Sequence, residues 1–543
     1  MNDSFSLLWL HDDEINHCPT LPASTFNDLH IGDVVAHIST SGTSRRFFSR
    51  LLQQLPTNAK TIAHRQEVLT DFVKQPQMTK AIAALLPKLD GLRPQPLTFR
   101  DRHAIFDVIE RIGELDLFLE CVNGFHAALS SADKLQSTGL QQLHRLIVDT
   151  TNDPRFTSLQ SELPELQATV QQTASVTIGV NLDHNLRPHE ATLLAINGEK
   201  FSEASMLDRL FGREDEFSRL GNFHRAGEID GVTMARIKEK NSPLMTPLFA
   251  DLAELLEAVS RPVANVLKKY GKLATASLVK FRDELAFYVT AAEMVEQLRG
   301  RGLEMVRPEI LPTAERTLQA THAYNLHLAL SNPKAQVVTS NINMGDEGRI
   351  FILTGPNGGG KTTFLQSVGL VQLFGQLGLY VPATAASISP ADNIYTHYQG
   401  EERPEAGTGR FGEEAVRLQK IFVTATAESL ILLNESLAST STGESLYIAQ
   451  DIVQLFRQMD VRAIFATHLH QLAANVKDLN QAAGAGIVVS LVASSRGAED
   501  GVRTFEVVVG EPLGRSYAKE LAIQYGIDAG QLTALLTKRG VIN

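Results

Sequence analysis

A glycine-rich segment in the second half of the chain has the residues of a phosphate-binding loop. The run Gly355-Pro-Asn-Gly-Gly-Gly-Lys361-Thr362 fits the pattern G-x-x-x-x-G-K-[ST] at every fixed position. Glycines let backbone N–H groups turn toward phosphate oxygens, Lys361 supplies a positive charge, and Thr362 offers a hydroxyl to Mg²⁺. The alternative is a glycine-rich turn that binds nothing. The residues expected to bind the nucleotide are Gly355, Pro356, Asn357, Gly358, Gly359, Gly360, Lys361, Thr362 and Thr363.

A second chemical element follows the apolar run Ser429–Leu433, where Asn434 and Glu435 stand next to each other. We expect Thr362 and Asn434 to lie at the metal. An amide accepts a hydrogen bond from a metal-bound water but brings no negative charge, so Mg²⁺ should bind more weakly than beside an aspartate. Glu435 stands where a general base for the attacking water is expected. The alternative is an ordinary strand end with an exposed glutamate.

His468 is the third candidate, because it follows the apolar run Val461–Ala466. The carboxyl end of a strand in an open α/β sheet lies at the ligand-binding edge. We therefore assign His468 a catalytic role in sensing the γ-phosphate, the alternative being a purely structural histidine. A guanine-reading N-K-x-D motif is not apparent at a strand end, so ATP is the preferred nucleotide rather than GTP.

The elements that position these residues alternate between strand and helix. Strands are expected over Arg349–Thr354, Ser429–Leu433 and Val461–Ala466, with an amphipathic helix before the last one. Such alternation predicts an α/β P-loop NTPase domain, with a parallel sheet covered by helices on both faces.

The first half of the chain is expected to be mainly helical. Apolar residues recur at helical spacing in Ala63–Val73, in Arg102–Phe125 and from about 244 to 300, a segment long enough for an extended lever. Residues 174–202 alternate instead and predict a small β insertion with a polar connection over Asp183–Glu190. We place a mainly helical domain with its lever at 1–315 and the P-loop domain at 316–543; that the first acts as a clamp and the second as an ATPase is implied only by the resemblance described below.

Bulk composition favours an ordinary globular protein of more than one domain. The 543 residues are 43% hydrophobic and 20% charged. The net charge is -11, so the chain as a whole lacks the positive charge that would indicate nucleic-acid binding. A local basic cluster at Arg236, Lys238 and Lys240 is equally well explained as a solvated helix face. The two cysteines, Cys18 and Cys121, have no metal or redox spacing, and neither a secretory signal nor a membrane span is evident. We expect a cytoplasmic protein.

Together these motifs resemble the ATPase domain of the MutS family of DNA mismatch-repair proteins. Gly355–Thr362 looks like that family's Walker A, Glu428–Glu444 like its Walker B and following loop, and Ala466–His468 like its histidine switch. Asn393–Ile421 occupies the place of the family's signature loop, and Gly510–Gly526 resembles its late Ser-Tyr motif. Ala63–Leu69 is similar to a segment of the family's helical core.

The resemblance implies a homodimer formed through the ATPase domains, with ATP and Mg²⁺ in two shared sites and the helical levers closing on DNA. It places Arg410 across the dimer interface. The sequence departs from the family at several points: the usual Walker B aspartate is Asn434, and Gly407–Glu414 lacks the usual Ser-Thr pair before Phe411. Because the sequence starts close to the helical core and stops at Asn543, we expect neither the domain that wedges beside a mismatch nor the family's long carboxyl-terminal extension.

The resulting hypothesis is a short, divergent MutS-like ATPase that binds DNA and hydrolyses ATP to drive closure of a dimeric clamp. Two alternatives remain open. The clamp acts on branched nucleic acid or the ribosome rather than on mismatches, or the protein is an ATP switch that hydrolyses slowly because of Asn434.

Overall fold

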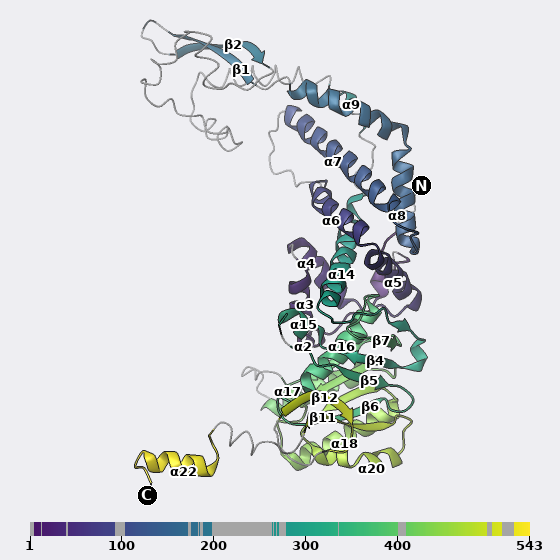
Figure 1. Cartoon of the computed structure of the whole chain (residues 1–543), viewed down its shortest axis with the longest axis vertical. Helices are drawn as coiled ribbons and strands as arrows, with labels where there is room; N and C mark the ends of the chain where they lie inside the picture. The colour runs from purple at the N-terminus through teal and green to yellow at the C-terminus, as the bar shows by residue number, and fades with distance from the viewer. Residues whose placement is uncertain are drawn as a thin grey trace. The chain divides into compact units, whose positions relative to one another are not determined.

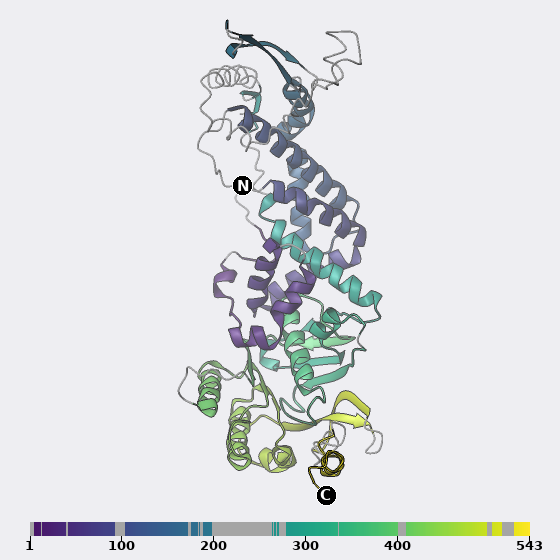
Figure 2. The same ribbon diagram turned by 90° about the vertical axis from the view of Figure 1, so that its left-hand side faces the viewer.

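The computed structural model describes most of the chain, which Figures 1 and 2 show in two views. The described residues are 5–11, 13–39, 42–92, 104–171, 175–182, 184, 188–197, 263, 265–267, 269–270, 278–334, 336–399, 409–496, 502–512 and 526–542. They pack into two compact units. The first unit comprises residues 1–83, 131–143 and 283–543, and the second comprises 84–130 and 144–282. The expected division at residue 315 concerns functional domains and stays a prediction.

Short helices open the first unit, and two longer ones then build its helical core. In α5 the side chain of Asn58 caps the first turn by accepting a hydrogen bond from the backbone N–H of Lys60 at 3.0 Å. Phe72 of α5 stacks on Tyr288 of α14, with ring centroids 5.8 Å apart. The bounds are α1 Glu14–His17, α2 Ala23–Asp28, α3 Ile31–Ile38, α4 Gly42–Gln53, α5 Ala59–Lys74 and α14 Arg282–Gly300.

Helices and one hairpin make up the second unit. Phe118 of α7 meets Phe156 of α9 edge to face at 6.1 Å, which is a preferred aromatic geometry. The expected β insertion is confirmed as an antiparallel hairpin, although its second strand begins at Pro188, inside the expected connection. Two helices run from one unit into the other: α6 Pro76–Gly91 and α8 Thr138–Thr151. The other elements are α7 Ala104–Ser130, α9 Pro154–Gln171, β1 Ser175–Leu182 and β2 Pro188–Asn197.

A six-stranded sheet forms the centre of the carboxyl-terminal half of the chain, in the order β12-β11-β6-β10-β9-β8. Neighbouring strands from β11 to β8 are parallel, as predicted, but β12 pairs antiparallel with β11 and closes that edge. Hairpin pairing of this kind needs only a short connection, whereas a parallel strand needs a long crossover. The strands are β6 Ile350–Thr354, β8 Ile394–Tyr398, β9 Leu430–Asn434, β10 Arg462–Ala466, β11 Val488–Arg496 and β12 Val502–Val509.

Helices cover both faces of this sheet. On one face, Ile350 and Ile352 of β6 pack in a hydrophobic core with residues of α17, α18, α19 and α20. The residues of α18 in this core are Ala449, Val453 and Phe456. On the other face α16 packs so closely on β9 that a Cβ at Gly369 would lie 3.2 Å from the Leu432 side chain. The helices are α16 Lys361–Gln376, α17 Gly409–Thr424, α18 Thr442–Met459, α19 His470–Ala474, α20 Val476–Gln481 and α22 Ala529–Lys538.

A smaller, mixed sheet has the order β3-β7-β4-β5; three of its strands come before β6 in the sequence, and β7 lies between β6 and β8. Its strands are β3 Glu309–Ile310, β4 Leu318–Ala323, β5 Ser340–Met344 and β7 Ala385–Ile388. The 3-10 helix η2 Thr313–Glu315 lies between β3 and β4, and α15 Leu326–Ser331 lies between β4 and β5.

The segment 63–69 joins the helical core to the part of the first unit that contains the two sheets. Gln66 of α5 donates a hydrogen bond to the carbonyl oxygen of Pro308 at 2.8 Å. Just past the end of α16, Gly378 has a φ of +77°, and a Cβ there would lie 2.4 Å from the Cβ of Arg65. Arg65 is fully buried, with its guanidinium 4.2 Å from the centre of the Trp9 ring. The end of the P-loop helix therefore rests directly on α5.

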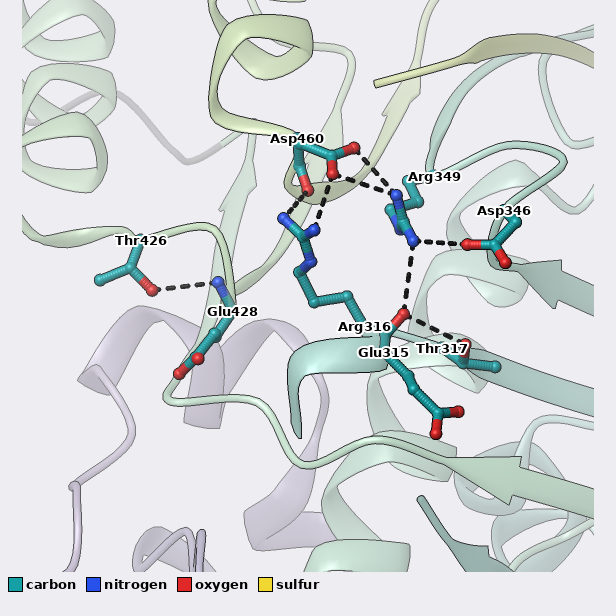
Figure 3. A network of polar contacts seen from close by, with 8 residues as sticks. All are labelled: Glu315, Arg316, Thr317, Asp346, Arg349, Thr426, Glu428 and Asp460. Atoms are coloured by element: carbon teal, nitrogen blue, oxygen red, sulfur yellow. Dashed lines mark hydrogen bonds and ion pairs between the residues drawn. The ribbon is translucent and has the colours of Figure 1, made fainter. Parts of the chain in front are cut away.

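An ion-pair network lies at the amino-terminal ends of β6 and β10 in the large sheet (Figure 3). Asp460, in the turn between α18 and β10, accepts hydrogen bonds from Arg349 at 3.0 and 3.1 Å and lies 2.8 Å from the guanidinium of Arg316. Arg349 also pairs with Asp346 at 2.7 Å. Because Asp460 and Arg349 are only 14% exposed at the side chain, each needs the other's charge. The candidate site residues Asn434, Glu435 and His468 lie at the other, carboxyl end of the strands.

Among the described residues, no helix combines the length and the apolar character needed to cross a bilayer. The basic cluster Arg236, Lys238 and Lys240 lies outside the described residues, as do most of residues 244–277 of the segment expected to be helical from about 244 to 300.

Candidate nucleotide-binding site

The predicted phosphate loop lies between the buried strand β6 and the first residue of α16. Gly360, directly before the helix, has a φ of +92°, which disfavours residues with a Cβ. At Gly355 a Cβ would approach the Cβ of Ala493 on β11 to 2.7 Å. The first N–H groups of α16 have no acceptor within the helix, so they and the helix dipole favour an anion at this position. The glycines are therefore needed for the path of the loop itself.

Lys361 is the first residue of α16 and is only 4% exposed. Its ammonium donates hydrogen bonds to the carbonyl oxygens of Gly355 at 3.0 Å and Pro356 at 3.1 Å, which points the charge back over the loop. Burial lowers the pKa of Lys361, and the nearby Glu435 carboxylate opposes that shift. A buried ammonium held over a ring of backbone donors is a strong anion-binding arrangement.

Thr362 and Asn434, the two expected metal-site residues, lie in direct contact. The Asn434 amide nitrogen donates to the Thr362 hydroxyl oxygen at 3.1 Å. Asn434 is the last residue of β9 and is 8% exposed. The strand brings the amide from 72 residues away in sequence to the start of the P-loop helix, as the spacing of the motifs predicts.

Glu435 and His468 also meet, with the Nε2 of His468 2.9 Å from one carboxylate oxygen of Glu435. Because a carboxylate only accepts hydrogen bonds, that ring nitrogen must carry the proton. The same oxygen lies 3.6 Å from the ammonium of Lys361. The His468 hydrogen bond, reinforced by the charges of His468 and Lys361, lowers the pKa of Glu435. Glu435 is thus held as a carboxylate between two donors.

The backbone at Glu435 is unusual, with a φ of +55° in the left-handed region. Its N–H donates to the carbonyl oxygen of Ala466 at 2.8 Å, which fixes the turn beside β10. Left-handed conformations of residues with a Cβ cost on the order of 1–3 kcal/mol and persist where the surrounding structure enforces them. Here the strained backbone aims the carboxylate at Lys361 instead of continuing the strand.

Sequence reasoning missed the residues that support this turn. The buried carboxylate of Glu414, on α17, accepts a hydrogen bond from the Leu437 N–H at 2.9 Å. The ring of His397 on β8 lies 2.7 Å from the Ser436 hydroxyl, and burial lowers the pKa of His397 to about 4. These residues come from separate elements and carry no shared motif, so only the fold brings them together.

A cleft of about 330 Å³ lies beside the loop and extends beyond the predicted residues. Phe505 of β12 and Asn325, the N-cap of α15, both line this cleft. Asn325 had a sequence signal, as an N-cap residue before residues 326–330, which are apolar apart from His327. Phe505 had none, because its role depends on the antiparallel edge strand. The lining residues that the motif did not identify are Ala323, Asn325, Leu328, Gln336, Val337, Val338, Ser340, Phe364, Ser367 and Phe505.

Two family models match the chain. The model of MutS domain V covers residues 351–526, and that of the MutS2 N-terminal domain covers residues 57–301. The chain is a MutS-like protein. The first match contains all of the glycine loop, Asn434, Glu435 and His468, so the site described above lies within the matched domain.

Several curated proteins with the name DNA mismatch repair protein MutS are similar to this MutS-like chain. That of Methanothrix thermoacetophila is 32% identical over 236 residues, 43% of this chain and 25% of the relative. That of Chlorobaculum tepidum is 30% identical over 241 residues, 44% and 25% of the two chains. That of Rhodopirellula baltica is 38% identical over 145 residues, 26% and 16% of the two chains. The chain thus spans a quarter or less of the length of these relatives.

Some residues of the resemblance lie outside the described part of the MutS-like chain. They include 400–408 of the signature loop, the side chain of Arg410, and 513–525 of the late motif. Their roles stay predictions.

Proposed function

We propose that this MutS-like chain binds and hydrolyses ATP with Mg²⁺ and uses the nucleotide to control binding to DNA. One observation carries the proposal. The carboxyl ends of β6, β9 and β10 bring Lys361, Glu435 and His468 to within hydrogen-bond or ion-pair distance of one another over a glycine loop. A charge to bind phosphate, a carboxylate to orient water and a histidine to link them are what phosphoryl transfer to water requires.

Binding of the triphosphate falls to the loop and to Lys361. The N–H groups at the start of α16 and the Lys361 ammonium offer donors on one side, and the cleft bordered by Asn325 and Phe505 offers room for the base and ribose. Because Lys361 is already desolvated, its attraction to phosphate is stronger than that of a lysine in water.

The Thr362 hydroxyl and the Asn434 amide fit a magnesium ion, since both offer oxygens at the end of the loop. Mg²⁺ at this position supplies charge to offset that of the β- and γ-phosphates. Mg²⁺ binds through a few protein oxygens together with substrate phosphates and water. A neutral Asn434 therefore permits the site, but leaves more of the metal's affinity to the nucleotide.

Glu435 is the proposed general base, and its contacts suggest how it is controlled. Without nucleotide, Lys361 and His468 both attract the same oxygen of Glu435. Phosphate oxygens compete for Lys361, so binding of ATP weakens one of these attractions. The carboxylate can then accept the proton of a water while His468 keeps it oriented.

Transmission to the helical core starts from contacts inside the first unit. The end of α16 lies against Arg65 of α5 at Gly378, and Gln66 holds the carbonyl of Pro308. We propose that residues 1–315 act as core, lever and clamp and residues 316–543 as the ATPase. In this proposal two copies pair through the ATPase part, with Arg410 reaching the partner's nucleotide, and the levers close on DNA.

A matched pair of variants tests the hydrolytic part. Glu435→Gln keeps the size of the side chain but removes the base, so we expect ATP still to bind while steady-state turnover falls at least about 100-fold. Glu428→Gln makes the same change at the other end of β9 and should leave turnover as in the wild type. If Glu435→Gln hydrolyses ATP at the wild-type rate, the assignment of the base is wrong.

A second candidate target is kept by the net charge of -11, which gives no general attraction to DNA. The clamp in this alternative holds branched nucleic acid or the ribosome. Binding of homoduplex, mismatched and branched DNA, each with and without ATP and over a range of salt, distinguishes the targets, because true phosphate contacts give a steep salt dependence.

A further inference from the structure

Three side chains with metal-ligating atoms meet behind the nucleotide cleft, away from the site described above. His30 lies directly before α3, Asp33 in its first turn, and His327 on α15. One ligand atom from each residue lies within 4.8 Å of the other two. His37, one turn further along α3, faces the same ring of His327 edge-on at 6.5 Å between centroids.

The spacing is close to that of a metal coordination shell. The Nδ1 of His30 is 3.0 Å from one oxygen of Asp33, and the Nε2 of His327 is 3.7 Å from that oxygen. Ligands about 2.0–2.1 Å from a tetrahedral Zn²⁺ are about 3.3 Å apart, and the two observed distances lie on either side of that value. The three ligand atoms all lie within 4.8 Å of one another, so rotation of the side chains is what completes the shell.

Several features hold the three residues in place before any ion arrives. His30 has a left-handed backbone, with φ of +52°, and its carbonyl oxygen accepts the N–H groups of Asp33 and Val34. The rings of His30 and His327 stack in parallel with centroids 4.6 Å apart. A preorganised cluster loses less conformational entropy when an ion binds.

The direction of the ligand atoms favours a cation. Both histidines turn a ring nitrogen toward the same Asp33 oxygen, at 3.0 Å from His30 and 3.7 Å from His327. Two imidazole nitrogens and one carboxylate oxygen thus face one region, where a divalent ion can accept a lone pair from each of them.

We propose that His30, Asp33 and His327 form a binding site for a divalent transition-metal ion, with Zn²⁺ the best match. Two imidazoles and one carboxylate form a three-ligand set that leaves a fourth position for water, and His37 is the nearest further imidazole. Imidazole ligands select Zn²⁺, Ni²⁺ or Co²⁺ over Mg²⁺, which prefers oxygen. This site therefore differs in chemistry from the one at Thr362.

The site connects two elements that border the P-loop helix. Asn325, two residues before His327, donates from its amide to the carbonyl oxygen of Thr363 at 3.1 Å. Gln366 donates to the carbonyl oxygen of Asp28, two residues before His30, at 3.0 Å. An ion that ties α3 to α15 thus braces the wall of the nucleotide cleft, and we expect it to raise the thermal stability of the chain.

The test uses the whole chain without an affinity tag, stripped with chelator and then titrated with Zn²⁺ in a calorimeter. His327→Gln and Asp33→Asn remove one ligand each, whereas His17→Gln removes an exposed histidine outside the cluster. Lys361→Ala serves as a second control because it alters only the nucleotide site. We expect one Zn²⁺ per chain in the wild type and both controls, with proton release on binding, and at least about ten-fold weaker binding in the two ligand variants.

Co²⁺ gives a second measurement that needs no variant. One equivalent bound in a site of low coordination number gives visible absorption much stronger than that of hydrated Co²⁺. The proposal is overturned if the ligand variants bind Zn²⁺ as tightly as the wild type. It is equally overturned if Co²⁺ with the wild-type chain shows only the weak spectrum of the hydrated ion.

Discussion

Replacing Asn434 by aspartate tests how the unusual strand end limits the metal site. The amide now donates a hydrogen bond to Thr362 at 3.1 Å, and its residue is 8% exposed. In Asn434→Asp that donor is lost and a carboxylate is buried, although the Thr362 hydroxyl can turn and donate instead. Without nucleotide we therefore expect a loss of about 1–3 kcal/mol in the free energy of unfolding.

With Mg²⁺ and ATP the sign reverses, because the new charge lies beside the ion. Changes next to a metal's ligands typically alter its affinity 10–100-fold, or about 1.4–2.8 kcal/mol. The assay is ATP turnover against Mg²⁺ concentration, with Asn434→Ala as the neutral control. The half-saturating Mg²⁺ concentration should fall at least about ten-fold in Asn434→Asp and not in Asn434→Ala. An unchanged Mg²⁺ requirement in Asn434→Asp would refute the placement of the metal at Thr362 and Asn434.

Three further predictions concern stability and pH. An alanine in Gly378→Ala must adopt a φ of +77° and displace Arg65, so the free energy of unfolding, measured in urea, should fall by about 3 kcal/mol. The control Gly443→Ala adds a Cβ that meets no other atom on α18, and it should have little effect. Burial lowers the pKa of His397 from 6.5 to about 4, so the unfolded chain takes up a proton on this histidine at a higher pH than the folded chain does. The free energy of unfolding should therefore fall by about 2 kcal/mol between pH 7 and pH 5. Urea unfolding at the two pH values measures this loss, which His397→Gln should not show. The lowered pKa of Lys361 means that the ammonium is lost at lower pH than in a solvated lysine, so ATP affinity, measured by calorimetry, should decline before pH 10.5 is reached; a flat affinity up to that pH would contradict it.

Much of the fold around the glycine loop could be predicted because its signals are local. Buried strands such as Ile350–Thr354 are short apolar runs, and the glycine loop needs its residue types for its own backbone path. The sequence also indicated that Lys361 lies near Glu435 and Thr362 near Asn434, because the carboxyl ends of neighbouring parallel strands share one edge of the sheet.

What the sequence did not predict depends on tertiary neighbours. The antiparallel direction of β12, and with it the place of Phe505, is set by pairing to β11, and no local pattern encodes it. The left-handed backbone at Glu435 is held by the hydrogen bond from its N–H to the carbonyl oxygen of Ala466. Because the residue is not a glycine, the sequence gives no sign of this conformation. The cluster of His30 and His327 joins residues almost 300 positions apart, so their proximity is visible only in the fold.

The central claim is that the loop and Lys361 grip a nucleoside triphosphate, and equilibrium binding of a fluorescent ATP analogue in the presence of Mg²⁺ tests it most directly. Wild type and Lys477→Ala, which changes an exposed lysine on α20, should bind alike, and Lys361→Ala should bind at least about 100-fold more weakly. Equal binding by Lys361→Ala, or no binding by the wild type, would contradict the account.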